Sequence, residues 1–381
     1  MVSRYGWLAA AMLMSLTVTA RAADPVKIGV ISPLTGTAAL YGQQQNWGVQ
    51  LALEDANKAG GVLGRPVVAA FEDDRCNPAE GVKATQRLIN EEKVATILGP
   101  ICSSSMLATM PVAQRSRVSV MTVTASSNDI VNRSGIGGNE FSFKASPADG
   151  DLARGVIGFI KSQGVRSVAI IGEDTDFGRG GAKLFTDGLA GTGIAIVASE
   201  FFPQGTPDFV SLVTKMKAVH PDRIAGYFIG GDIANFTRQS EQSGVGIPFT
   251  GRIDLAIAVS AASKAFLEKG ALNGSSGSLF YSPAVDSSEN RAFVAKFRAK
   301  FHEDPTQHGF YGYEGTQILL DAIRRAGSTD PREVQKALKA TKLHSILGGD
   351  YEFDDHNHAH NNGVVTEIQD GKVVMVSLFK S

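Results

Sequence analysis

The sequence lacks the common motifs that identify catalytic and nucleotide-binding sites in enzymes. It contains no GxxxxGK[ST] phosphate loop, no GxGxxG after the first predicted strand, and no HExxH or GxSxG motif. It also lacks the basic excess of a general nucleic-acid binder, because 37 basic residues face 38 acidic ones. Its 42 glycines follow no three-residue period, which excludes collagen. We therefore expect neither an enzyme nor a nucleic-acid-binding protein, and no cofactor.

Cysteine is scarce as well. Cys76 and Cys102 are the only two in the chain, and no CxxC spacing suggests a metal pair. Each follows a predicted strand, and neighbouring strands of a parallel sheet would bring the two ends together. An oxidising compartment would favour their pairing, which should stabilise the fold by about 3–4 kcal/mol in the chain-entropy model. Two unpaired thiols are the alternative.

Long apolar runs are missing except near the start of the chain. Arg4 precedes an apolar run over residues 7–18, and Ala20-Arg21-Ala22 offers the small-x-small site of a signal peptidase. A membrane anchor is the alternative, but the run is short for a bilayer of about 30 Å. We expect residues 1–22 to be a cleaved secretory signal and the protein to be exported.

The chain has 381 residues, which is too long for one compact core and suits two lobes of ordinary size. Helices separate short β-branched runs, and helical crossovers of ten or more residues predict parallel, doubly wound sheets. The fold class is therefore α/β, with two such lobes joined by hinge strands. The predicted strands are 26–31, 67–71, 95–98, 118–122, 168–171, 194–198, 223–229 and 248–250.

The end of the chain follows a different pattern. Residues 364–368 and 373–378 flank Asp370-Gly371, a strong hairpin turn signal. A closing hairpin after an array of strands and helices indicates that the chain crosses between the lobes more than once. We expect the first lobe to contain residues 24–144 and about 276–350, and the second to contain 145–275 and about 351–381.

Two hydroxyl-rich corners follow predicted strands of the first lobe. Ser103-Ser104-Ser105 follows the strand at 95–98, and Thr124-Ala125-Ser126 follows the strand at 118–122. Helix N-termini bind anions such as carboxylates, and open α/β sheets bind ligands at the carboxyl ends of their strands. The alternative is that the serines are only N-caps. The two corners together predict a ligand site.

A histidine cluster near the C-terminus is weaker evidence for a binding site than the two corners are. His356, His358 and His360 stand beside Asp354 and Asp355, and alternate residues of an extended segment share a face. A weak metal site is one interpretation, and a solvated hairpin loop is the other. We assign no metal site from the sequence.

Several longer motifs occur together over the chain after residue 23: Ile28–Gly36, Tyr41-Gly42, Asn57–Gly64, Asp73–Pro78, Cys102–Ser105, Asp176–Gly178 and Gly226–Phe228. With these motifs the sequence resembles the periplasmic leucine/isoleucine/valine-binding family of ABC transporters, which has the type I periplasmic binding fold. The resemblance is highly specific in the first lobe and looser in the second. It implies a monomeric clamp that closes over its ligand by hinge rotation and delivers it to permease subunits in the inner membrane.

The resemblance also implies roles for the two corners. Ser103 would donate its hydroxyl and its backbone N–H to the carboxylate of an amino acid. In the Thr124-Ala125-Ser126 corner, Ser126 would donate its N–H to the carboxylate and offer its hydroxyl to the ammonium, which the Thr124 carbonyl would also face. Cys76 and Cys102 match the family's disulfide.

Other pocket residues follow less directly. Tyr41 and Phe177 match positions that wall the pocket in the family. Phe310 and Tyr311 are further wall candidates, with core packing as the alternative.

The second lobe departs from the family pattern at Gly251-Arg252-Ile253-Asp254, where the family supplies a carboxylate to the ammonium. Asp254 is our candidate for that carboxylate, with Asp232 as an alternative. Asp254 could instead only cap the next helix. Arg252 is unexpected there and could meet a second carboxylate on a different ligand.

Together these observations predict the solute-binding component of an ABC importer that captures a small amino acid, aliphatic or branched-chain by resemblance. An amide, a urea-like compound or an aromatic carboxylate is the alternative ligand. A ligand sensor is the alternative role.

Overall fold

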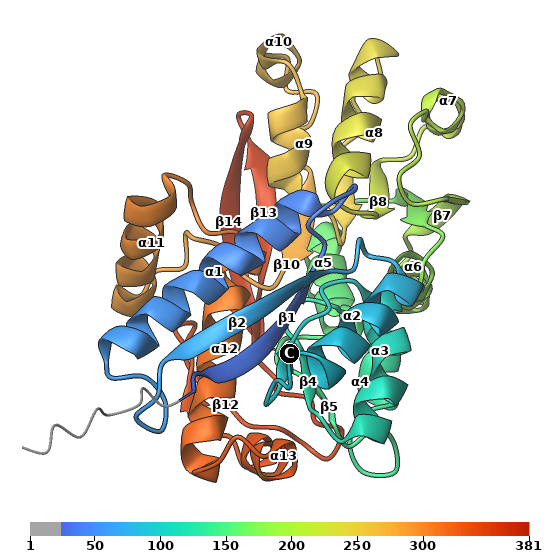
Figure 1. The fold of residues 1–381 in the computed structure, drawn as a ribbon. Coiled ribbons are helices and arrows are strands. Elements are labelled where there is room, and N and C mark those ends of the chain that lie inside the picture. Colours follow the sequence, from blue (N-terminus) through green and yellow to red (C-terminus); the bar gives the residue numbers. More distant parts are fainter. Residues whose placement is uncertain (1–23, 381) are drawn as a thin grey trace, which may run out of the picture.

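Two separate parallel sheets organise residues 24–380, the part of the chain that the computed structural model describes (Figure 1). The first has the order β2-β1-β3-β4-β5, and the second has the order β7-β6-β8-β9. All neighbouring strands in both sheets are parallel, which confirms the predicted fold class of two α/β lobes. The strands are β1 (Val26–Ser32), β2 (Val67–Asp73), β3 (Ile97–Leu98), β4 (Val120–Thr122), β5 (Ser142–Lys144), β6 (Ser167–Glu173), β7 (Ala195–Phe202), β8 (Arg223–Tyr227) and β9 (Phe249–Gly251). The predicted signal, residues 1–22, lies outside the described residues.

Helices from both ends of the chain cover the first sheet. They are α1 (Ala39–Lys58), α2 (Pro78–Asn90), α3 (Ser103–Ser116), α4 (Asn128–Asn132), α11 (Ser288–Phe301), α12 (Gln307–Ala326) and α13 (Pro331–Lys339). Helices α1 and α12 approach so closely that only glycine fits at their crossing. A Cβ atom at Gly48 would lie 2.1 Å from the Gly309 carbonyl oxygen, and one at Gly312 would lie 2.3 Å from that of Gln45. This contact fixes the start of α12 beside the first lobe's ligand-facing edge.

The second lobe is built around an aromatic core. Phe202, Phe209 and Phe228 pack edge to face, and Phe236 and Phe249 extend the cluster. Its helices are α5 (Asp149–Ser162), α6 (Asp176–Leu189), α7 (Val210–Val219), α8 (Gly230–Gln242), α9 (Leu255–Ala261) and α10 (Lys264–Glu268). Helices α7 to α10 gather at the end of the molecule farthest from α12 and α13 (Figure 1). Within the described residues, no helix combines the length and apolar character needed to cross a membrane.

A third, antiparallel sheet connects the lobes. Strand β10 (Ser276–Leu279) pairs with β13 (Asn362–Gln369), which pairs with β14 (Lys372–Lys380). The predicted Asp370-Gly371 turn is confirmed, and both residues have the positive φ that a tight hairpin requires. Val364 packs in the core of the first lobe and Ile368 in that of the second. The chain therefore crosses between the lobes in the 144–149 segment, at β10 and again along this hairpin.

The segment just before this hairpin lies with the first lobe, whereas the sequence analysis assigned everything after about residue 351 to the second. Two short strands, β11 (Leu343–His344) and β12 (Asp350–Tyr351), precede it. Tyr351, Phe353 and Ala359 pack in the first lobe's core. The backbone of His358 forms an isolated parallel β-bridge with that of Lys144 at the end of β5. The alternation in Tyr351-Glu352-Phe353 directs both aromatic rings into that core, so the return to the second lobe comes later.

Candidate functional site

A cavity lies between the carboxyl ends of the two sheets, where the lobes face each other. Six of the nine predicted ligand-binding residues line it: Tyr41, Ser103, Thr124 and Ser126 from the first lobe, and Phe177 and Asp254 from the second. Ser104 of the first corner and Arg252 also line it, and the structure adds residues that the sequence analysis had not placed there, among them Glu173, Gln204, Phe228, Gln307 and His308.

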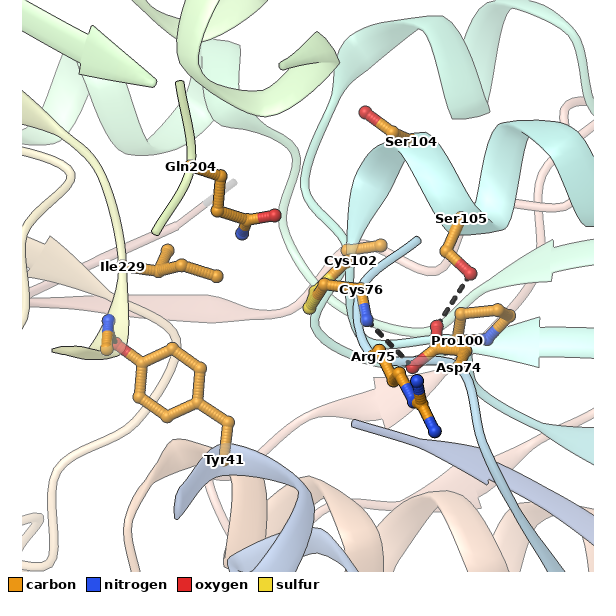
Figure 2. Close-up of a disulfide and its surroundings, with 12 residues drawn as sticks. Tyr41, Asp74, Arg75, Cys76, Pro100, Cys102, Ser104, Ser105, Gln204 and Ile229 are labelled. Carbon is orange, nitrogen blue, oxygen red and sulfur yellow. Dashed lines mark hydrogen bonds between the residues drawn. A yellow bond between two sulfur atoms is a disulfide. The ribbon is translucent and has the colours of Figure 1, made fainter. Parts of the chain in front are cut away.

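The two lobes touch around this cavity, so the structure is a closed form of the clamp. The Gly230 N–H donates to the Tyr41 hydroxyl oxygen at 3.0 Å, and the Gly231 N–H donates to the Thr37 carbonyl at 2.9 Å. On another side the Asp176 N–H donates to the Ser104 hydroxyl at 3.1 Å. Figure 2 shows Tyr41, with Gln204 and Ile229 of the second lobe, across from the disulfide.

The first corner is the start of α3. Cys102 is the N-cap residue of this helix and makes no side-chain cap bond. Ser103 and Ser104 are the first two residues of the helix, and both line the cavity. The predicted Cys76–Cys102 disulfide is present and ties this helix start to the end of β2. Beside it the Ser105 hydroxyl donates to the buried Asp74 carboxylate at 2.6 Å (Figure 2). The helix N-terminus is thereby held in place with hydroxyls and backbone N–H groups beside the cavity.

The second corner is bound to the first. The Ser127 N–H donates to the Ser103 hydroxyl at 3.2 Å. The Thr122 hydroxyl donates to the Pro100 carbonyl at 2.7 Å and accepts from the Ala125 N–H at 3.1 Å. Ala125, also predicted to bind the ligand, is buried and is not part of the cavity lining. Its carbonyl accepts from the buried Lys144 ammonium at 2.8 Å. Both corners therefore belong to one rigid unit of the first lobe.

Asp254 occupies the opposite wall. It caps α9 by accepting from the Ala256 N–H at 3.1 Å, and it also lines the cavity, so the capping role and the proposed ligand role coexist. Burial raises the pKa of its carboxyl, and the backbone bonds and the Arg252 charge oppose that rise. Asp232, the alternative, accepts from the Gly205 N–H at 2.8 Å and is not part of the cavity lining.

Arg252 brings a buried guanidinium to the same wall. Its Nη1 donates to the Ser278 carbonyl at 3.1 Å, and its guanidinium lies 4.3 Å from the centre of the Phe280 ring. Its Nε forms a long ion pair with the Asp149 carboxylate at 3.9 Å. That distance is too long for a hydrogen bond, and Nε has no hydrogen-bond partner among the described residues. Burial lowers the pKa of Arg252, and the nearby Asp149 carboxylate opposes that shift. An arginine guanidinium keeps its charge in proteins. An anionic ligand group would find a favourable charge here.

Glu173, at the end of β6, is a cavity residue that the sequence analysis missed. Its carboxyl accepts from the Ile229 N–H at 2.8 Å and from the Gln204 amide at 3.4 Å. Burial raises the pKa of Glu173 to about 8, so the side chain is uncharged at neutral pH.

His308, in the first turn of α12, was also missed. Its ring stacks on Tyr41 with 4.1 Å between ring centres, and burial lowers its pKa to about 3. Neither ring nitrogen has a hydrogen-bond partner among residues 24–380, and the Thr124 hydroxyl is likewise buried without one. These unpaired polar atoms line the same cavity, as expected of a surface that completes its hydrogen bonds with a ligand.

Phe310 and Tyr311 do not reach the cavity. Phe310 stacks on Tyr281 with 4.2 Å between ring centres, and Tyr311 packs edge to face on Phe280, both in the first lobe's core. Only the first turn of α12, with Gln307 and His308, borders the cavity. The core-packing alternative is therefore the one that the structure shows for these two rings.

The fold, the closed cleft and the paired corners can now be compared with known proteins. The family model described as "Periplasmic binding protein" matches residues 25–372. The chain belongs to the periplasmic binding protein family. Members of this family are binding proteins that serve transport, not enzymes, in agreement with the missing catalytic motifs.

Individual relatives of this periplasmic binding protein are distant but cover nearly its whole length. An "Amino acid binding protein" of Pseudomonas aeruginosa is 28% identical over 94% of this chain and 98% of its own. The crystal structure of a leucine-binding protein from Thermotoga maritima has a TM-score of 0.78 at 25% identity, over 93% of this chain and 98% of its own. A solute-binding protein from Rhodopseudomonas palustris, solved with 3,4-dihydroxybenzoic acid, has a TM-score of 0.81 at 23% identity. The match covers 93% of this chain and 97% of that one.

Proposed function

We propose that this protein is the periplasmic receptor of an ABC importer and that it captures a small aliphatic α-amino acid. The supporting observation is the two-sided polarity of the closed cleft. Hydroxyls and the start of α3 form one wall, and the buried Asp254 carboxylate forms part of the other. A carboxylate suits the first wall, and an ammonium suits the part of the second wall that Asp254 forms, which is the charge pattern of an amino acid.

Dehydration explains why both walls are needed. A zwitterion loses strong hydration when it is enclosed, so the cleft must replace those contacts at both charged ends. Ser103, Thr124 and Ser126 would serve the carboxylate end, and Asp254 would serve the ammonium. Phe177 and Phe228 leave apolar surface for the side chain, where each buried methylene contributes about 0.8 kcal/mol.

The periplasmic location and the transport role belong to the same proposal. The family membership supports both, and the expected signal at residues 1–22 supports the location. Permease subunits in the inner membrane would receive the ligand from the closed clamp, and the receptor would act as a monomer.

An aromatic carboxylate is the second candidate, and one observation favours it. The Arg252 guanidinium, with its unpaired Nε, lies in a cavity that also has Tyr41 and Phe177 in its walls. An aromatic acid would pair its carboxylate with Arg252 and place its ring between the aromatic side chains. The Rhodopseudomonas palustris protein of the same fold was solved with such a ligand.

The first experiment is a ligand screen on protein that has been unfolded and refolded to remove bound ligand. Thermal shifts are measured with leucine, isoleucine, valine, alanine and threonine, and with benzoate, 4-hydroxybenzoate, acetamide and urea. A ligand at 100 times its Kd adds about 2.7 kcal/mol to the free energy of unfolding. We expect aliphatic amino acids to raise the melting temperature most. A response to aromatic acids alone would replace the first candidate by the second.

The Asp254→Asn variant then distinguishes the two ligand classes by calorimetry. The amide keeps an oxygen for the Ala256 N–H cap but cannot pair with an ammonium. We expect amino-acid affinity to fall by about 2–5 kcal/mol, while an aromatic acid, which has no ammonium, should bind no more weakly. Asp232→Asn is the matched control, because this buried carboxylate lies outside the cavity lining. Unchanged amino-acid affinity in Asp254→Asn would remove Asp254 from the site.

A further inference from the structure

A second group of potential ligand atoms lies away from the cleft. Asp151, His358 and His360 each offer one, and these atoms all lie within 4.8 Å of one another. Asp151 is in the first turn of α5, just after the chain has crossed to the second lobe. The two histidines lie in the segment 352–361, just before the chain crosses again. The cluster therefore joins two segments next to the hinge.

The hydrogen bonding of His358 leaves one ring nitrogen ready for a metal ion. Its Nε2 lies 2.8 Å from the Ser146 carbonyl oxygen. Because a carbonyl can only accept, Nε2 carries the hydrogen and Nδ1 keeps its lone pair. Metal-binding histidines commonly donate their second N–H to a backbone carbonyl in this way.

Of the other two members, His360 is exposed to solvent, whereas the side chain of Asp151 is only 12% exposed. Asp151 accepts from the Ala148 N–H at 3.0 Å and forms an ion pair with Arg154, whose side chain is 71% exposed and can turn into solvent. The side chain of His360 is 53% exposed, and its Nε2 lies 3.4 Å from the Asp354 carboxylate. An ion can therefore reach the cluster from solvent and bind beside a buried imidazole.

We propose that Asp151, His358 and His360 form a binding site for a divalent transition metal of the Zn²⁺ type. Two imidazoles and one carboxylate suit Zn²⁺, Ni²⁺ or Cu²⁺, and three protein ligands leave a coordination position for water. Mg²⁺ and Ca²⁺ prefer all-oxygen sites and should bind poorly. A bound ion would connect α5 to the 352–361 segment beside the hinge. The proposal is independent of what the cleft binds.

The test uses the mature chain without a histidine tag, stripped with EDTA and dialysed. Calorimetric titration with ZnCl₂ should show one ion per chain and a rise in melting temperature, with neither effect for MgCl₂ or CaCl₂. His360→Ala should weaken Zn²⁺ binding by at least about tenfold. His356→Ala is the matched control, because this exposed histidine lies on the same segment outside the donor group, and it should bind Zn²⁺ like the unmodified protein.

A variant in α5 tests whether the effect of His360→Ala comes from lost metal binding or from a disturbed 352–361 segment. Asp151→Asn keeps an oxygen for the Ala148 N–H and should also weaken Zn²⁺ binding, with circular dichroism confirming that the protein is folded. The proposal is wrong if His360→Ala and Asp151→Asn bind Zn²⁺ as tightly as the unmodified protein. It is equally wrong if His356→Ala weakens binding as much as His360→Ala, because Zn²⁺ would then bind exposed histidines without selection.

Discussion

At the scale of single residues, the cleft contains an acid that is neutral in the folded protein at physiological pH. Burial raises the pKa of Glu173 from its ordinary value of 4.5 to about 8. Between these two values the folded protein holds a proton that the unfolded chain has lost. Stability therefore falls as pH rises through this window, because the native state binds more protons there.

This behaviour can be measured by substituting the acid with its amide. Between pH 5 and pH 8 the Glu173 contribution to stability should fall by about 3 kcal/mol, and Glu173→Gln should remove that fall. Urea denaturation of ligand-free protein at several pH values gives the difference between the two proteins, which cancels the other titrating groups. The exposed Glu91→Gln change is the control and should leave the pH dependence as it is. A difference between Glu173→Gln and the unmodified protein that does not vary with pH would show that Glu173 is ionised in the folded state.

The same scale shows which cavity residues the sequence could predict. Ser103, Thr124 and Ser126 were accessible to sequence reasoning because they follow strand ends, and such ends meet at one edge of a parallel sheet. His308 was not, since it is one polar residue at the start of a long, mostly buried helix. A residue of this helix faces the cavity only if the cavity extends that far along the helix, and the sequence does not show where the cavity ends. The same reason explains why Phe310 and Tyr311 were considered for the pocket wall although they pack in the core.

At the scale of elements, the start of α3 depends on the disulfide that fixes it. The bond joins residues 26 positions apart, and Cys102 directly precedes Ser103. Loss of the bond should lower the free energy of unfolding by about 3–4 kcal/mol, because the unfolded chain is no longer constrained. It should also weaken ligand binding, because the helix start loses its tie to β2.

Urea denaturation of a Cys76→Ser, Cys102→Ser double variant measures this effect. Reductant should bring the unmodified protein close to the variant and leave the variant unchanged, which separates the bond from the substitutions. An equal free energy of unfolding for variant and unmodified protein, without reductant, would contradict the expectation.

Most elements could be predicted, because their signals are local. Strand β1, the capped start of α2 at Asn77-Pro78 and the turn at Asp370-Gly371 each have their own pattern in the sequence. The lobe boundary near residue 351 was less predictable. An alternating segment such as Tyr351-Glu352-Phe353 shows that one face is buried, but it does not show which of two cores covers that face.

At the scale of the whole molecule, closure depends on one glycine. Gly230 has a φ of +53°, and a Cβ atom there would lie 2.1 Å from the Thr37 carbonyl oxygen on the other lobe. Alanine at this position would clash only when the lobes are together. We expect Gly230→Ala to keep the clamp partly open and to lower ligand affinity by at least about tenfold, which corresponds to 1.4 kcal/mol.

Small-angle scattering with and without ligand measures this effect, since the radius of gyration of Gly230→Ala should shrink less than that of the unmodified protein. Gly244→Ala is the matched control. This glycine follows the same helix, has a φ of +65° and has no atom within 4 Å of the added Cβ. It therefore carries a similar backbone cost without the clash. If both variants bind and close alike, the Thr37 contact does not limit closure.

The bond between the Ser127 N–H and the Ser103 hydroxyl has a kinetic consequence. Both hydroxyl corners are assembled within one lobe, so in the proposed site an open molecule would already present a complete binding surface to an arriving solute. The rate of capture is then a property of that lobe alone. Asp254 and the Gly230 contact belong to the other lobe. In the proposed site they would act only after arrival and would govern how long the solute stays bound. Substitutions in the second lobe could therefore change how long the solute stays bound without slowing its capture from dilute solution.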